Sequence, residues 1–105
     1  MNKSKIKKEL KNAKAILRCA KEFNMVGDPT RLKICYLLCQ RRGLTVSEIA
    51  EIVEVSISAV SHTLKKLQET NIVENHRDFR NVYYKLKESF FTNLLKRWLK
   101  HHAKI

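Results

Sequence analysis

Several polar side chains between Ser56 and Lys66 have the types and spacing of a surface that contacts nucleic acid. In a helix over this segment, they share the face opposite an apolar stripe. Serine hydroxyls permit close approach to base edges, a histidine can donate or accept a hydrogen bond there, and lysines neutralise phosphates. The alternative is an ordinary solvated helix, which would more often carry Glu–Lys pairs than serines. The candidate contacts on this helix are Ser56, Ser58, Ala59, Ser61, His62, Lys65 and Lys66.

The segments that must position this face have the order of a winged helix-turn-helix. Apolar periodicity predicts helices over about 29–40, 45–53 and 56–70, and alternating residues predict strands over 72–77 and 82–86. The helix-turn-helix then covers 44–70 and the hairpin, or wing, covers 72–86. The expected fold class is therefore mainly α with one small β-hairpin.

Capping residues mark the expected helix boundaries. Asp28 and Ser56 precede helical segments and can accept hydrogen bonds from free backbone amides. Thr45 with Glu48 three residues later forms a capping-box pattern. Gly27 is expected to end the first helix in a left-handed conformation. The helix over 45–53 is expected to turn Ile49, Ile52 and Val53 inward.

Two further candidate DNA contacts lie in the hairpin tip at 78–81 or next to it. Arg77 and Arg80 can reach along the phosphate backbone or into a neighbouring minor groove. A structural hairpin with incidental arginines is the alternative. The charge found elsewhere in the chain favours contact with DNA.

Both ends of the chain are expected to be amphipathic helices that form a dimer. Apolar residues recur at steps of three and four through 1–26, which predicts one long helix with a lysine-rich opposite face. A broad apolar stripe runs through the helix expected over 88–102, and packing within one subunit is the alternative use of that stripe. The stripe consists of Phe90, Phe91, Leu94, Leu95, Trp98 and Leu99.

Composition limits the classes of protein that fit. The 105 residues predict a single domain over 1–105, and the 44% hydrophobic fraction excludes an intrinsically disordered chain. The net charge of +12 is unevenly spread: 1–24 carries +6, 25–55 is neutral, and 56–87 and 88–105 each carry +3. The charged start and three irregularly spaced cysteines predict a cytoplasmic protein.

Two function classes remain, and neither is an enzyme. No nucleophile–base pair, carboxylate pair or phosphate-cradling glycine loop is visible in the sequence. The polar helix face favours a sequence-specific transcriptional regulator, whereas the lysine-rich ends favour a non-specific architectural protein.

Four ordered motifs resemble the ArsR/SmtB family of bacterial and archaeal transcriptional repressors over about residues 16–102. The resemblance implies a homodimeric winged helix that joins through its terminal helices and binds an inverted-repeat operator. It also implies release from DNA by a metal ion or another chemical signal. The motifs lie at 27–32 (GDPTRL), 44–50 (LTVSEIA), 58–62 (SAVSH) and 82–84 (VYY).

The signal-binding sites implied by the resemblance are incomplete, so no metal and no cofactor is expected. Thr45 and Ser47 occupy the places of a Cys-x-Cys pair, and neither supplies a thiolate. A zinc-type site falls at Glu88, Phe90, His101 and Lys104, of which only Glu88 and His101 can ligate. Sulfide-type sensors need a cysteine in the last helix, where this chain has none.

The remaining sensor candidates are Cys19, Cys35, Cys39 and His101. Cys35 and Cys39 lie four residues apart on one helix face and could bind a soft metal or respond to an oxidant. Core packing is the stronger alternative for Cys35, since it occupies a periodic apolar position. A small inducer is a further alternative. The resemblance also places Phe79 where glycine is common, which leaves the wing conformation open.

Overall fold

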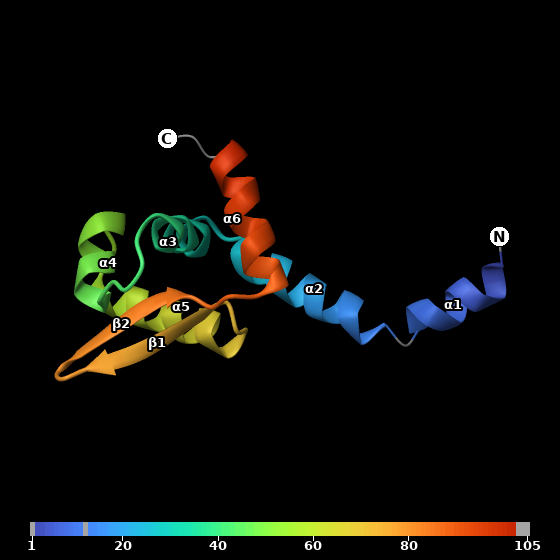
Figure 1. The fold of residues 1–105 in the computed structure, drawn as a ribbon, viewed down its shortest axis with the longest axis horizontal. Helices are drawn as coiled ribbons and strands as arrows, with labels where there is room; N and C mark the ends of the chain where they lie inside the picture. The colour runs from blue at the N-terminus through green and yellow to red at the C-terminus, as the bar shows by residue number, and fades with distance from the viewer. Residues whose placement is uncertain (1, 12, 103–105) are drawn as a thin grey trace.

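The computed structural model describes residues 2–11 and 13–102, which form a mainly α fold with one antiparallel hairpin (Figure 1). The predicted fold class, a winged helix-turn-helix, is confirmed. None of the helices in these ranges is long and apolar enough to cross a membrane. The elements are α1 (Lys3–Lys11), α2 (Lys14–Val26), α3 (Pro29–Gln40), α4 (Val46–Val53), α5 (Ile57–Glu69), β1 (Val73–Asp78), β2 (Asn81–Leu86) and α6 (Phe90–His102).

The three predicted amino-terminal caps are present. The Asp28 carboxylate accepts a hydrogen bond from the backbone N–H of Arg31 at 3.0 Å, which starts α3. Thr45 and Glu48 form the complete capping box of α4. The Ser56 hydroxyl accepts from the backbone N–H of Ala59 at 3.1 Å and so starts α5. Each cap satisfies an amide that the helix itself leaves unpaired.

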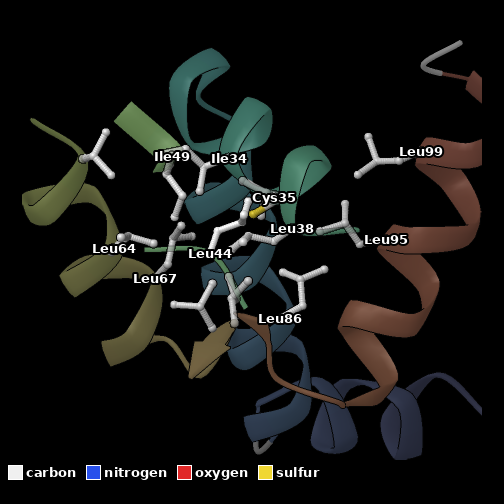
Figure 2. Close-up of a cluster of buried hydrophobic side chains, with 14 of the residues drawn as sticks. Ile34, Cys35, Leu38, Leu44, Ile49, Leu64, Leu67, Leu86, Leu95 and Leu99 are labelled. Atoms are coloured by element: carbon white, nitrogen blue, oxygen red, sulfur yellow. The ribbon is translucent and has the colours of Figure 1, made fainter. Parts of the chain in front are cut away.

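The core lies where α3, α4, α5 and the base of the hairpin meet, and Leu95 and Leu99 of α6 also belong to it (Figure 2). Its fully buried side chains come from each of these elements, so the hydrophobic effect joins them into one unit. Leu44, just before α4, also pairs with Tyr84 of β2 through backbone bonds of 3.1 and 2.7 Å. The residues with no exposed surface include Ile34, Cys35, Ile49, Val60, Leu64, Leu67 and Ile72.

The prediction of one helix over 1–26 is wrong, because α1 and α2 are separate helices. Ala13, just before α2, has φ −83° and ψ 81°, outside the helical region. α1 contains no buried residue, so no tertiary packing enforces a continuous helix. Lysines three and four residues apart also repel one another along this segment. Met1 and Asn12, which fall in the predicted range, lie outside the described residues.

Two further expectations are corrected. Gly27 follows α2 as predicted but has φ −77°, so it is not left-handed. Ile52 is 56% exposed, although the helix period directs it inward. The side of α4 that meets the core is centred on Ile49 and Ala50 instead.

Candidate nucleic-acid interface

The polar face of α5 is solvent-exposed while its opposite face is fixed in the core. Val60, Leu64 and Leu67 have no exposed surface, and they hold the helix against α4 and β1. Their burial turns the other side of the helix outward. Ser58, Ser61, His62 and Lys65 are exposed, and Ala59 and Lys66 are half-buried. The candidate contacts therefore lie on one helix in the predicted arrangement.

Ser56 lies at the amino-terminal end of this face, where it caps α5. Its oxygen accepts the Ala59 amide proton, while its own hydroxyl hydrogen remains available to donate. Unpaired amides and the helix dipole make this end of α5 attractive to a phosphate oxygen. The arrangement can thus bring bases and backbone to the same helix end.

The hairpin extends away from the core, with its tip far from α6 (Figure 1). Cα pairing runs from Val73 with Leu86 to Asp78 with Asn81, so the loop is Phe79 and Arg80 alone. Arg80 in this loop and Arg77 in β1 are both exposed, as contact with a phosphate backbone requires.

The backbone of Phe79 defines the conformation of the turn at the tip of the wing. It has φ 56°, the left-handed backbone that glycine adopts without cost, and its side chain is 92% exposed. The tight two-residue turn is therefore kept with a non-glycine residue, and an aromatic ring stands exposed at the tip.

Two interactions across the hairpin were not predicted. The rings of His76 and Tyr83 stack with centroids 5.5 Å apart and an interplanar angle of 24°. The Lys85 ammonium lies 3.5 Å from the Glu74 carboxylate. Both pairs are directly opposed in the strand register, which could have revealed them once the two-residue loop was assumed.

The candidate sensor residues differ in how far their side chains are exposed to solvent. Cys19 is exposed, Cys39 is half-buried, and Cys35 is completely buried. Burial raises the pKa of the Cys35 thiol from 9.0 to about 12, with a smaller contribution from Cys39. His101 is exposed near the end of α6. Within residues 2–11 and 13–102, no group of three His, Cys, Asp or Glu side chains could hold a metal ion. Lys104 lies outside these ranges.

The comparisons with known proteins agree with this geometry. Residues 28–75 match the family model described as bacterial regulatory protein, arsR family. The cadmium resistance transcriptional regulatory protein CadC of Listeria innocua is 36% identical over 73 residues, 70% of this chain and 61% of that protein. The chain thus spans less than two thirds of the length of that relative.

Two other proteins match over larger shares of their length. The arsenical resistance operon repressor of Bacillus subtilis is 35% identical over 74 residues, 70% of each chain. The homodimeric winged helix-turn-helix DNA-binding domain of Mb0332 from Mycobacterium bovis has a TM-score of 0.73 and 24% identity, covering 88% of this chain and 85% of that domain. The resemblance noted in the sequence is confirmed. The chain belongs to the arsR family of bacterial regulatory proteins.

Proposed function

We propose that this chain is a DNA-binding transcriptional regulator that represses its target as a homodimer on an inverted-repeat operator. The exposed Ser, His and Lys face of α5, held in place by a fully buried opposite face, carries the proposal. The family supports it, since the relative from Bacillus subtilis is itself named a repressor.

The proposed contacts divide into two groups. Ser58, Ser61 and His62 contact base edges, because their short side chains let the helix enter a major groove closely. Ser56 and Ala59 lie at the leading end of the same helix. The cations neutralise phosphates and supply affinity without sequence preference. This second group consists of Lys65, Lys66, Arg77 and Arg80.

The dimer is proposed from apolar surface that the monomer leaves exposed. The stripe of α6 is divided: Phe91, Leu95 and Leu99 are buried, whereas three other members face solvent. A groove of about 380 Å³ lies between α2 and α6, lined by apolar side chains almost throughout. A second copy would cover this surface and place two copies of α5 roughly 34 Å apart, in successive major grooves. The exposed members are Phe90, Leu94 and Trp98, which are 86%, 46% and 53% exposed.

Binding measured over rising salt concentration tests the proposal against a non-specific architectural protein. That alternative is favoured by α1, which carries five lysines and buries none of its residues. A repressor binds an operator fragment more tightly than scrambled DNA of equal length, and it retains this preference as salt weakens both complexes. Equal affinities for the two DNAs at every salt concentration would reject the repressor hypothesis and favour the architectural protein.

The proposed signal acts through thiol chemistry or a small inducer. Thr45 is committed to the cap of α4, and Cys35 is buried in its protonated form. Cys19 and Cys39 are the accessible thiols that a soft metal or an oxidant could reach. Metal content and thiol titration of the purified protein, with and without DNA, test this part. If DNA affinity is unchanged after loading with metal or treatment with oxidant, thiol chemistry is rejected as the signal and a small inducer is the remaining hypothesis.

A further inference from the structure

A basic cavity lies between the end of α3, the end of β2 and the middle of α6, away from the exposed face of α5 and from the hairpin tip. Its volume is about 240 Å³. Two of its lining residues are leucines, and the rest carry charged groups or, in one case, a thiol. The lining residues are Leu38, Cys39, Arg42, Lys85, Leu86, Glu88, Lys96 and Lys100.

The positive charge of this cavity exceeds the negative charge available to it. Lys85 has a partner, the Glu74 carboxylate. No ion pair with Arg42, Lys96 or Lys100 occurs among residues 2–11 and 13–102. Glu74 and Glu88 together oppose four cations, which leaves a net charge of +2. Cations gathered in a concave site partly lined by leucines concentrate positive potential there, and they attract an anion.

The thiol of Cys39 experiences this potential. Partial burial raises the pKa of Cys39, while the charges of Lys96 and Lys100 lower it. Both ammonium groups of α6 therefore act on a group in the wall formed by α3. The potential reaches across the cavity from one helix to the other.

The cavity uses a face of α6 that the proposed dimer leaves open. Lys96 and Lys100 lie four residues apart on one side of the helix. Phe91 and Leu95 are on the buried side of α6. The helical period places the two lysines on one flank of that side and the exposed apolar residues, such as Leu94, on the other flank. A second copy bound to the exposed apolar side would therefore leave the cavity open.

We propose that this cavity binds a compact anion with two or more negative charges, carried by phosphate or carboxylate groups. Arg42 can hold two oxygens at once through its planar guanidinium, and the lysines supply point charges around it. Because Lys85 belongs to the wing strand β2, a bound anion joins the wing to α3 and α6. It should thereby change DNA affinity, a consequence that rests on the proposed function.

Calorimetric titration of the full chain without DNA tests the site. The probes are inorganic pyrophosphate and citrate, with ionic strength held constant by NaCl. Saturable binding of one anion per chain is expected, and the stronger of the two probes identifies phosphate or carboxylate as the preferred group. The double variant K96Q/K100Q should lower affinity at least tenfold, whereas Arg97→Gln, an exposed cation on the same helix, should keep it within twofold. No saturation by either probe, or equal losses in both variants, would overturn the proposal.

Alkylation with neutral iodoacetamide, followed residue by residue by mass spectrometry, locates the bound anion. Pyrophosphate or citrate at saturation should slow modification of Cys39 several-fold and leave exposed Cys19 unchanged. Binding without protection of Cys39 would place the anion elsewhere and refute this site. Neither experiment contains DNA, so failure here is distinguishable from failure of the proposed function. The change in DNA affinity is measured separately, with the same probes added to an operator complex.

Discussion

The ring of Phe23 on α2 meets the ring of Phe91 on α6 edge to face, with centroids 5.4 Å apart and planes at 87°. Phe91 is 7% exposed and Phe23 is 59% exposed. This pair therefore joins the core of the subunit to its exposed apolar surface. Both rings line the groove proposed as a dimer contact.

The dimer proposal predicts that Leu94→Glu weakens self-association. The new carboxylate would have to be buried in an apolar contact, so the dimer dissociation constant should rise at least tenfold, about 1.4 kcal/mol. Sedimentation over a range of protein concentrations measures this. Asn93→Glu adds the same charge at an exposed neighbouring position and should leave the constant unchanged. Equal effects of the two substitutions would argue against this face.

Substitutions at Ser56 and Ser58 should distinguish an effect on stability from an effect on DNA binding. Ser56→Ala removes the cap of α5 and should lower the free energy of unfolding by about 1 kcal/mol, measured by urea denaturation. Ser58→Ala, on the exposed face, should change stability little but reduce discrimination between operator and scrambled DNA. A stable Ser58→Ala variant with full discrimination would remove this serine from the base contacts.

Lys65 and Arg80 are predicted to contact phosphates. Replacing either by Ala should weaken binding to all DNA sequences alike and reduce the slope of log affinity against log salt by about one. Fluorescence anisotropy titrations at several salt concentrations measure the slope. Arg97→Ala provides the control and should keep the wild-type slope, since Arg97 is an exposed cation on α6, which lies away from the hairpin tip (Figure 1). A loss confined to one operator would reassign Lys65 or Arg80 to base contacts.

The left-handed Phe79 predicts a stabilising substitution. Phe79→Gly removes a conformational cost of about 1–2 kcal/mol, offset by about 0.5–1 kcal/mol of added entropy in the unfolded chain. The free energy of unfolding should therefore rise by roughly 0.5–1 kcal/mol. Phe79→Ala keeps the positive φ without glycine's freedom, so it should give no such gain. Equal stability of the two variants would show that the turn carries no strain.

Cys35 predicts a loss of stability at alkaline pH. Its thiol has a pKa of about 12 in the folded chain against 9.0 ordinarily, so the unfolded chain loses this proton first. Above pH 9 and up to about 12, the wild type should lose about 1.4 kcal/mol of stability per pH unit relative to Cys35→Ala. Urea denaturation from pH 8 to 10.5 measures the difference. Parallel pH profiles would contradict the burial of a protonated thiol.

Local chemistry made much of this fold predictable from sequence. Asp28, Thr45 and Ser56 mark helix starts because their side chains accept hydrogen bonds within three residues, whatever the rest of the chain does. Asn71, just after α5, has φ 62°, a left-handed backbone that asparagine tolerates better than most residues. The exposed face of α5 followed from the period of its apolar residues.

Features that depend on distant segments were missed. Ile52 fits the helix period, but only a narrow side of α4 meets other elements. The break before α2 has no glycine or proline to mark it, because it arises where packing is absent rather than where a residue forbids the helix. Arg42, Lys85 and Lys96 meet around one cavity from three separate elements or their ends, and no spacing in the sequence relates them.

The backbone pairing of Leu44 with Tyr84 has a mechanical consequence. It bonds the chain just ahead of α4 to the strand that leads into α6, so a displacement of the wing strand would also move the start of the helix-turn-helix. We therefore expect α4, α5 and the hairpin to move together, which would keep the two proposed DNA-contacting parts in one relative position. In the proposed dimer, control of DNA binding would then change the angle between the two subunits rather than the position of the wing within one subunit.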